Sequence, residues 1–546
     1  MHQPGKATAW NEATDREARA RPWLLTSFFL FASGAFVYLR CFPLFGVPYA
    51  QLGDSDLFVD DAMRMVEGQV IYRDFAQAIL PGTELVYLAL FKLFGVRAWI
   101  PSALTVALAV ALAWASWRIS RRILSGALTY VPALLFLVFG YSRVLDPTHH
   151  FFSAVAVAGA LAVVVEEPSA SSIVAGALCG VAAFFTHTRG LVAVVGLSVF
   201  LLLRSRRERR PWRESFTGIA TLLLGFCVVL GLLCLPFARQ VGWHELFNST
   251  VTFLLKYGSR YPGWTFASYG TDAPPAVSWR QLPAWCTWAF IYLLVPGIYG
   301  AALLALHRIS RQGWQPIHDR LLLLNVFGLA LFLGIAKSPG QTRLVADSLP
   351  AFILLVWYLD SQNALTCRLL RALVFIALAY AVAIDWPRQP LWLDVPAGRV
   401  AFDRNNKADF GDYLWLAEHT QPGEYFLATD RPALYFWFHL RPATPVLVLS
   451  TSEFTRPEQV AATIASLERS RVRYVAWDAA LEFDPRMSGG DHLQPLRDYL
   501  HERYRPLRWF LHDATLWQRV PAVLPPAGLA ARRYRRPTSI LPPSAR

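Results

Sequence analysis

Long apolar runs dominate the chain from residue 23 to residue 390. Each run extends over about 17 to 23 residues, the length that an α-helix needs to cross roughly 30 Å of hydrocarbon. The runs lie near residues 23–40, 80–96, 98–117, 124–142, 150–166, 171–187, 190–203, 216–236, 283–306, 320–337, 346–359 and 368–384. This pattern predicts a mainly α-helical protein, with a polytopic transmembrane bundle of about 11–13 spans over 23–390.

The pattern changes after residue 400, where shorter helical and strand periodicities alternate. We expect a small soluble α/β domain over 400–521. Its predicted elements are helices near 409–419 and 457–470 and strands near 425–429 and 473–477. The final segment, 522–546, is rich in Pro and Arg and is expected to form a disordered basic tail.

Composition supports a membrane protein. Hydrophobic residues make up 55% of the chain and charged residues 16%, whereas charged residues make up about 25% of a soluble domain; the mean hydropathy is +0.34. The net charge of +14 comes from arginines gathered in short clusters between apolar runs, such as the cluster at 204–210. They form no continuous basic face with interleaved aromatics, so the expected partner is the lipid bilayer and not a nucleic acid.

The arginine clusters also predict how the bundle is oriented. Cytoplasmic loops carry an excess of Lys and Arg, which makes 1–22 a cytoplasmic N-terminal tail and places the loop 41–79 outside. The same rule predicts a multi-pass protein of the cytoplasmic (inner) membrane with an extracytoplasmic C-terminal domain. Chain ends on opposite sides require an odd number of crossings, and the runs above are even in number. One segment between residues 80 and 187 is therefore expected not to form a separate crossing.

The outside loop holds the first candidate chemistry. Asp54 and Asp56 precede a stretch whose apolar positions suit a helix lying along the membrane interface. One interpretation is that Asp54 only caps this helix. The other is catalytic, because four carboxylates fall within the eight positions from Asp54 to Asp61, more than capping requires.

A second polar cluster follows the run that ends near residue 142. Arg143, Asp146 and His149 lie at the mouth of the bundle, where they suit binding of an anion, a proton or a metal. The alternative is an ordinary interfacial turn at Pro147. Four further cations fall at predicted outside ends, where together they suit a phosphate or pyrophosphate and singly each also suits a snorkelling helix end. They are Arg189, Lys256, Arg260 and Arg343.

The order of these motifs resembles the membrane glycosyltransferases of the GT-C fold, specifically the protein O-mannosyltransferase and lipid A aminoarabinose transferase group (glycosyltransferase families 39 and 83). The first loop matches that group's acidic helix-opening motif and the Gly, Tyr and Asp segment that follows it. The matching residues are Asp54, Phe58, Ala62, Met65, Gly68, Tyr72, Arg73, Asp74, Pro81 and Gly82. Leu145-Asp146-Pro147 and Thr188-Arg189-Gly190 look like two later motifs of the same enzymes.

The match departs from the group's pattern in the first loop. Ser55 stands where a second acid is usual, Phe58 replaces Tyr, and Met63 replaces Arg. Asp56 is then an alternative source of the missing acid, so the sequence leaves the choice between Asp54 and Asp56 as catalytic residue open.

The resemblance implies transfer of a sugar, a hexose or a pentose, from a polyprenyl-phosphate donor to an acceptor on the outer face of the membrane. The acceptor is a glycolipid, a cell-envelope polysaccharide or a protein. Asp54 or Asp56 would take the acceptor proton, and the cations would stabilise the departing lipid phosphate. The substrate-binding residues expected are Arg73, Asp74, Arg143, Asp146, His149, Arg189, Lys256, Arg260 and Arg343. No cofactor is assigned, and a divalent cation held by Asp54, Asp146 and His149 stays an open alternative.

Two other functions compete with this one. A transporter or flippase of lipid-linked sugars would carry ionisable residues at mid-membrane and matched broken helices in two halves. Here the acids gather in one interfacial loop, which favours an enzyme. A membrane scaffold that binds through its C-terminal domain is the third function, but that domain shows no phosphate loop or nucleophile motif and suits an accessory role such as acceptor docking.

Overall fold

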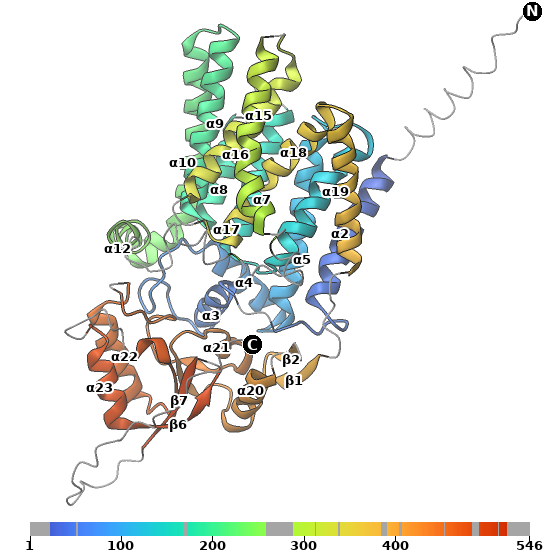
Figure 1. Cartoon of the computed structure of the whole chain (residues 1–546). Helices are drawn as coiled ribbons and strands as arrows, with labels where there is room; N and C mark the ends of the chain where they lie inside the picture. The colour runs from blue at the N-terminus through green and yellow to red at the C-terminus, as the bar shows by residue number, and fades with distance from the viewer. Residues whose placement is uncertain are drawn as a thin grey trace, which may run out of the picture.

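The computed structural model shows a bundle of long helices with a small α/β domain at one end (Figure 1). The structure describes residues 22–50, 53–166, 172–257, 273, 285, 288–311, 313–336, 339–383, 390–402, 407–452, 454–482, 491–511 and 513–520. The predicted N-terminal tail lies outside these residues except for residue 22, and the predicted tail 522–546 lies wholly outside them.

The bundle contains the long apolar helices that the hydrophobic runs predict. Its single helices are α2 (Pro22–Cys41), α5 (Trp99–Ser120), α7 (His149–Glu166), α8 (Ser172–Phe185), α9 (His187–Arg207), α10 (Trp212–Val241), α15 (Val295–Ser310), α16 (Pro316–Ile335) and α19 (Ala364–Ala383). A further span, Gly126–Arg143, is built from η1 (Gly126–Tyr130), α6 (Val131–Leu135), η2 (Phe136–Gly140) and η3 (Tyr141–Arg143). The pair α17 (Gln341–Asp347) and α18 (Leu349–Ser361) is bent by 60°.

Nine described helices are long and apolar enough to cross a membrane, and ten if the bent pair forms one span. The described chain also has one shorter apolar helix, α8, and counting it gives eleven apolar segments, an odd number within the predicted 11–13. The protein is a multi-pass membrane protein, and its fold is the predicted one.

The prediction of a span over 80–96 is wrong. This run forms α4 (Gly82–Phe94), which extends about 20 Å and, unlike α8, carries charged residues, Glu84 and Lys92, and is not among the apolar helices that could cross a membrane. Helix α4 lies at the base of the bundle beside α3 (Ser55–Val66), next to the C-terminal domain (Figure 1). It is the segment between 80 and 187 whose removal makes the number of crossings odd.

Close backbone contact holds α8 against α10. A Cβ added at Gly176 of α8 would overlap the carbonyl oxygen of Leu222, and one at Gly225 of α10 would overlap the carbonyl oxygen of Ile173. Helices in lipid gain little from the hydrophobic effect between them, so small residues that allow such contact favour their association.

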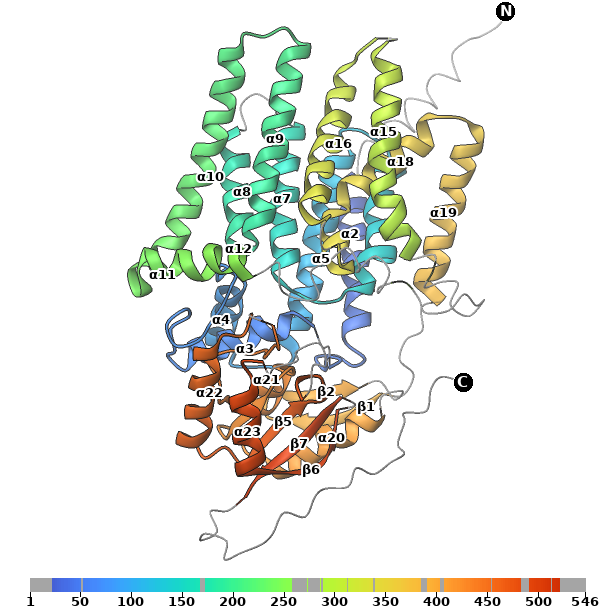
Figure 2. The ribbon, with the colours of Figure 1, turned by 60° about the vertical axis from the view of Figure 1, so that its left-hand side comes forward.

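The arginine-rich turns gather at the end of the bundle opposite the C-terminal domain. The turns that join α9 to α10 and α15 to α16 lie at that end (Figure 2). Arg121 pairs there with Glu166 at 3.0 Å, and Arg118 contacts the same carboxylate. The grouping of cations at one end is the feature that the orientation argument requires.

The C-terminal part forms the expected α/β structure. Its elements are β1 (Leu391–Val395), β2 (Gly398–Phe402), α20 (Lys407–His419), β3 (Tyr425–Ala428), α21 (Ala433–Phe438), β4 (Arg441–Pro442), α22 (Pro457–Arg469), β5 (Tyr474–Asp478), η9 (Ala479–Leu481), α23 (Gln494–Arg503), β6 (Tyr504–Phe510) and β7 (Ala514–Arg519). The four predicted elements correspond to α20, β3, α22 and β5. The main sheet has the order β4-β3-β5-β7-β6, with β4, β3 and β5 parallel and β7 antiparallel to both of its neighbours.

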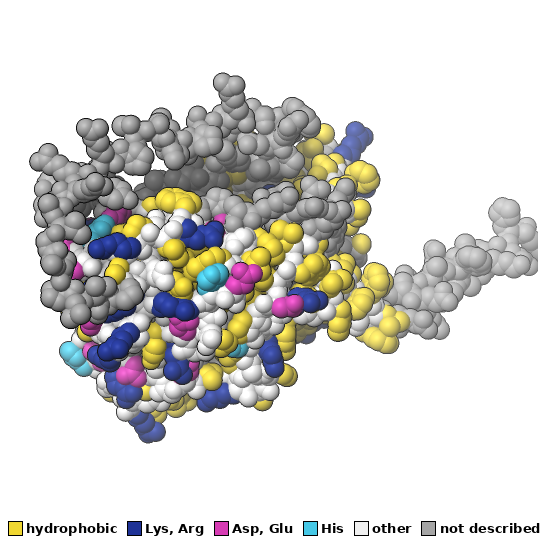
Figure 3. All heavy atoms as spheres, turned by 90° about the horizontal axis from the view of Figure 1, so that it is seen from below, with side chains coloured by type: hydrophobic (Ala, Val, Ile, Leu, Met, Phe, Trp, Pro, Cys, Tyr) yellow, Lys and Arg dark blue, Asp and Glu magenta, His cyan; other side chains and the backbone are white. Residues whose placement is uncertain are grey.

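The interfacial helix α3 lies between the bundle and this domain and shares a hydrophobic core with both α4 and the domain (Figures 1 and 2). Phe58, Val59 and Ala62 of α3 are fully buried in it. The domain residues of that core include Leu434, Phe436, Trp437, Leu440 and Tyr474. The underside of the domain carries interspersed charges of both signs (Figure 3), as a water-exposed surface does.

Candidate active site

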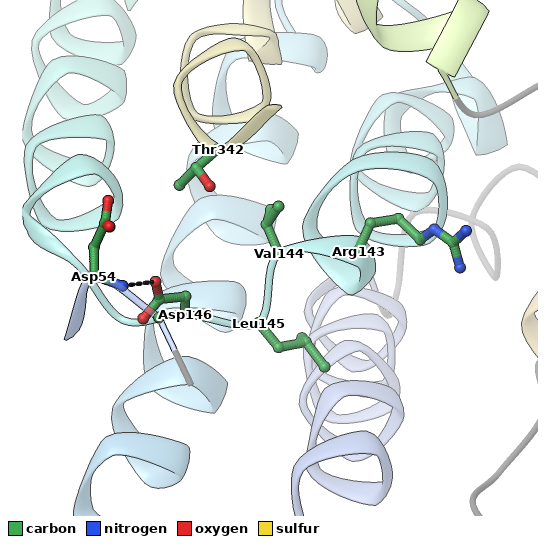
Figure 4. A pocket seen from close by; sticks show the side chains of 7 residues that line it. Asp54, Arg143, Val144, Leu145, Asp146 and Thr342 are labelled. Atoms are coloured by element: carbon green, nitrogen blue, oxygen red, sulfur yellow. Dashed lines mark hydrogen bonds between the residues drawn. The ribbon is translucent and has the colours of Figure 1, made fainter. Parts of the chain in front are cut away.

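A cavity opens where the N-terminus of α3 meets the bundle. It has a volume of about 370 Å³, which is in the range of sites for small molecules. It is lined by Gly53, Asp54, Arg143, Val144, Leu145, Asp146 and Thr342. Three segments distant in sequence meet there, namely the start of α3, the 143–146 stretch and α17 (Figure 4).

Asp54 occupies the N-cap position of α3 but does not cap the helix. Its side chain accepts no capping hydrogen bond. The carboxylate projects into the cavity, away from Asp146 (Figure 4). The interpretation of Asp54 as a simple capping residue is therefore wrong.

Asp146 takes over the capping of α3. Its Oδ2 accepts a hydrogen bond from the Asp54 backbone N–H at 2.9 Å, and its Oδ1 accepts one from the Ser55 N–H at 3.2 Å. The close approach of the Asp146 side chain to this backbone requires a glycine at position 53, because a Cβ there would lie 2.6 Å from the Asp146 Cγ atom. Both carboxylate oxygens of Asp146 thus hold the backbone that carries Asp54.

The two cavity carboxylates differ from free aspartate in their acidity. Asp54 is exposed to the open cavity, but the protein around it removes part of its hydration and raises its pKa, and the positive charge of Arg343 acts in the opposite direction. Burial raises the pKa of Asp146 to about 6. The hydrogen bond from the Ser55 hydroxyl lowers this pKa, and the nearby charge of Asp54 raises it. A carboxylate with a raised pKa is a stronger base than a free one, which suits proton abstraction near neutral pH.

Asp56, the alternative catalytic acid, does not line the cavity. Its side chain is buried, and its Oδ2 accepts a hydrogen bond from the Gly53 N–H at 3.2 Å. Burial, followed by the nearby charge of Asp146, raises the pKa of Asp56 well above its usual value. Asp54 is thus the carboxylate that faces the cavity, while Asp56 lies behind it.

Two arginines approach the cavity from the bundle. Arg343 of α17 interacts electrostatically with Asp54, Asp347 and Arg189. Arg189 of α9 is buried and pairs with Asp347 at 2.6 Å, and it also donates to the backbone oxygen of His150 at 2.7 Å. The guanidinium of Arg189 is thus engaged inside the bundle, where it holds α17, and Arg343 carries the charge that reaches Asp54.

Comparison with known proteins identifies the fold. No family model and no curated protein sequence matches the chain. ArnT from Cupriavidus metallidurans bound to undecaprenyl phosphate aligns with a TM-score of 0.55 and 14% identity, over 93% of this chain and 100% of that chain. Its apo state gives a TM-score of 0.55 and 14% identity, over 92% and 98%. The chain has the GT-C fold. An oligosaccharyltransferase from Archaeoglobus fulgidus has a TM-score of 0.47 and 12% identity, over 89% and 72%.

Some residues predicted for the site lie elsewhere in this GT-C fold. Arg73 and Asp74 form an exposed ion pair at 2.8 Å, in which the hydrogen bond from Arg73 lowers the pKa of Asp74. Lys256 is exposed on α12 (Phe253–Tyr257), with its Nζ 5.0 Å from the ring centroid of Tyr257. Arg143 lines the cavity, but its guanidinium points away from Asp54 and Asp146 (Figure 4). Arg260 lies outside the described residues.

The open alternative of a metal site receives no support from the described part of the chain. No group of three or more His, Cys, Asp or Glu residues is placed there to hold a metal ion. His149 is buried, and its ring packs 5.1 Å from that of Phe58 and 3.9 Å from that of His150. The described side chains of Asp54, Asp146 and His149 thus form no ligand set.

Sequence reasoning missed two residues that shape the cavity in the GT-C fold. Gly53 allows the close approach of Asp146, and Thr342 also lines the cavity. A glycine next to the first Asp was the available signal for the former. The stretch that contains Thr342 attracted notice only for its cation Arg343, because an uncharged side chain gives no signal of its own.

Proposed function

We propose that this protein is a membrane glycosyltransferase that moves a sugar from a polyprenyl-phosphate donor to an acceptor hydroxyl. The observation that carries the proposal is the Asp54 carboxylate, which faces the cavity with a raised pKa and is held from behind by Asp146. The shared fold with ArnT, which was solved with undecaprenyl phosphate, supports the choice of donor.

The proposed step is a single displacement at the anomeric carbon. The acceptor oxygen attacks that carbon while its proton passes to the Asp54 carboxylate. The bond from the anomeric carbon to the phosphate oxygen breaks, and the electron pair leaves with the lipid phosphate. Arg343 stabilises the negative charge that develops on the phosphate. The configuration at the anomeric carbon is inverted.

We infer the orientation of the protein from the placement of its charges. We place the arginine-rich end in the cytoplasm, so that the cavity and the 400–521 domain lie on the outer face of the cytoplasmic membrane. Glycolipid, cell-envelope polysaccharide and protein hydroxyls are the acceptors considered. The apolar helix surfaces beside the cavity would hold the polyprenyl tail in the bilayer.

The bent pair α17–α18 favours a second candidate, a transporter or flippase of lipid-linked sugars. Transporters place broken helices at their substrate sites, and this pair bends by 60°. In this chain, however, Asp54 and Asp146 lie outside the long apolar helices. A transporter would move labelled lipid across proteoliposomes with no change in the sugar-lipid bond.

The test is sugar transfer by membranes that contain the Asp54→Asn variant. The substrates are undecaprenyl-phosphate-linked radiolabelled hexose and pentose, and the measurement is label that reaches the cell envelope fraction. We expect a loss of about 10²- to 10⁴-fold, since this is the usual contribution of a general base. Asp56→Asn is the matched control and should lose less than Asp54→Asn. Full transfer by Asp54→Asn at normal expression would refute the catalytic assignment.

A further inference from the structure

Arg64 of α3 is buried, pairs with Asp60 of the same helix, and ties α3 to the C-terminal domain through a hydrogen bond. Arg64 Nε donates to Asp60 Oδ2 at 3.0 Å, and the two side chains are 3% and 0% exposed. Arg64 Nη1 also donates to the backbone oxygen of Thr444 at 3.0 Å. Its guanidinium lies 5.3 Å from the ring centroid of Phe75. One side chain thus joins helix, loop and domain.

Two backbone hydrogen bonds also join the residues that flank α3 to the C-terminal domain. We call this contact surface between α3, its flanking residues and the domain the seam. The Ala76 N–H donates to the Pro445 oxygen at 2.8 Å, next to Thr444. The Ala50 N–H donates to the Ala401 oxygen at 2.7 Å. With the apolar residues of α3 in the core of the domain, a shift of α3 requires a matching shift of the domain.

The buried Asp60–Arg64 pair has features that do not favour stability, which indicates another role. A buried ion pair often stabilises a protein no more than apolar side chains of similar volume, because both charges lose their hydration. Asp60 Oδ1 and Arg64 Nη2 are buried with no hydrogen-bond partner among the described residues. Burial also raises the pKa of Asp60 to about 6, despite the charge of Arg64 and the hydrogen bond from it. Because this pair lowers stability in these ways and lies in the helix that carries Asp54, its role is to hold α3 in position.

We propose that Arg64 is a positioning residue that fixes Asp54 in the cavity by locking α3 to the C-terminal domain. This inference rests on the proposed function. Along a helix that rises 1.5 Å per residue, Asp60 lies about 9 Å and Arg64 about 15 Å from Asp54. Asp146 holds the N-terminal end of α3, and Arg64 holds its last turns. The C-terminal domain thereby becomes part of the active-site scaffold, a larger role than docking an acceptor.

The experiment compares the full-length wild type with Arg64→Lys in the radiolabel assay, over a range of donor concentrations and pH. Lysine keeps the charge but not the forked geometry that reaches both Asp60 and Thr444. We expect kcat to fall about tenfold, because small misplacement of a catalytic group costs this much or more. KM for the donor should stay unchanged. The acidic limb of kcat/KM should move to lower pH, because water that enters beside a loosened Asp54 lowers its pKa.

Two matched variants separate positioning from stability. Arg497 forms a similar buried pair with Asp491 at 2.7 Å and donates to the Leu481 oxygen at 2.6 Å, but it lies in α23, outside the seam. Arg497→Lys should lower Tm and leave kcat and the pH profile unchanged. Arg441 pairs with Glu67 across the same seam in an exposed position at 3.2 Å, and Arg441→Gln should change neither Tm nor kcat.

A third variant keeps the test usable if Arg64→Lys fails to fold. Replacing both members of the pair, Asp60→Leu with Arg64→Met, leaves no unpaired charge and should fold, yet it lacks the link to Thr444 and should show the same fall in kcat. A lowered Tm with wild-type kcat and pH profile in the variants of Arg64 would overturn the inference. Transfer by Asp54→Asn at the wild-type rate would instead refute the proposed function, whatever Arg64 does.

Discussion

The two ends of the bundle use charge in opposite ways. At the arginine-rich end the cations are partly exposed, and they pair at the surface, as Arg121 does with Glu166 and Arg207 with Asp319. The other end has exposed pairs too, such as Arg73–Asp74, but there Arg64 is buried and Asp146 half-buried, and both hold backbone groups.

This difference distinguishes charged side chains that set the orientation of the protein in the membrane from those that hold the candidate site in place. A surface pair is replaceable by water and contributes at most about 1 kcal/mol. A buried polar side chain has no such replacement, so its loss leaves a donor or acceptor unsatisfied at a cost of about 1–3 kcal/mol. Variants at the two ends should therefore differ strongly, and the following tests proceed from the largest expected effect to the smallest.

Among these tests of support around Asp54, Gly53→Ala should have the largest effect. The added Cβ would lie 2.6 Å from Asp146 Cγ and 3.0 Å from its Oδ1, so Asp146 must leave the end of α3. We expect sugar transfer to fall about 10²-fold, since the base and its support move together. Gly411→Ala in α20, where a Cβ meets nothing within 4 Å, is the control and should be fully active. Equal activity in both variants would contradict the role of Asp146.

Asp146→Ala should cost somewhat less, because the backbone of α3 keeps its other contacts. The variant leaves the N–H groups of Asp54 and Ser55 without their acceptor. We expect a fall in kcat of about tenfold and a loss of roughly 1 kcal/mol in unfolding free energy, as for other helix caps. Asp146→Asn keeps one acceptor oxygen and should recover part of both losses. Thermal melts and transfer rates measure the two effects, and an Asn variant that is no better than Ala would contradict capping.

Much of the fold could be predicted from the sequence. Long apolar runs allow one structure in lipid, the helix, because every backbone polar group must be paired within it. The exception, residues 80–96, contains a helix that carries Glu84 and Lys92 and is short, since Gly82 begins it and Gly95 ends it. Hydropathy averaged over a window that includes both flanks overestimates the length of the helix in such a segment.

Less of the site could be predicted. Asp54 and Asp146 stand out as acids at the mouths of apolar runs, but their contact joins residues 92 positions apart. Periodicity carries no information about such a contact. Arg73 and Lys256 carry the expected charge yet lie away from the cavity, because charge alone does not show where a loop folds. Arg64 gave no signal, since a cation within an amphipathic helix usually faces water.

Asp61 should affect the pH dependence of the unfolding free energy without affecting catalysis. Its Oδ2 accepts a hydrogen bond from Gln77 at 2.7 Å, and burial raises its pKa to about 8. The folded pKa lies above the unfolded value, so this group's contribution to stability is fully present below about pH 4 and is lost progressively as pH rises from about 4 to about 8. One such proton gives a slope of about 1.4 kcal/mol per pH unit over that window.

Asp61→Asn should therefore weaken the pH dependence of stability and leave transfer nearly unchanged. The amide keeps an acceptor oxygen for Gln77 and never ionises. Thermal melts in detergent from pH 4 to pH 9 measure the difference, with Asp394→Asn as control, because Asp394 is exposed and its pKa is lowered by the hydrogen bond from Arg399. A steeper or unchanged pH dependence in Asp61→Asn would contradict the assignment of the slope to this group.

Arg207→Gln, at the arginine-rich end, should have the smallest effect. Arg207 contacts Asp319 and lies 4.8 Å from the ring centroid of Trp314, but its side chain is 29% exposed. Water can replace these contacts, and the neighbouring arginines preserve the charge bias that sets orientation. We expect a change in unfolding free energy within about 0.5 kcal/mol and wild-type transfer, measured beside Arg64→Lys. A loss of transfer as large as that of Arg64→Lys would show that the two ends do not divide these roles.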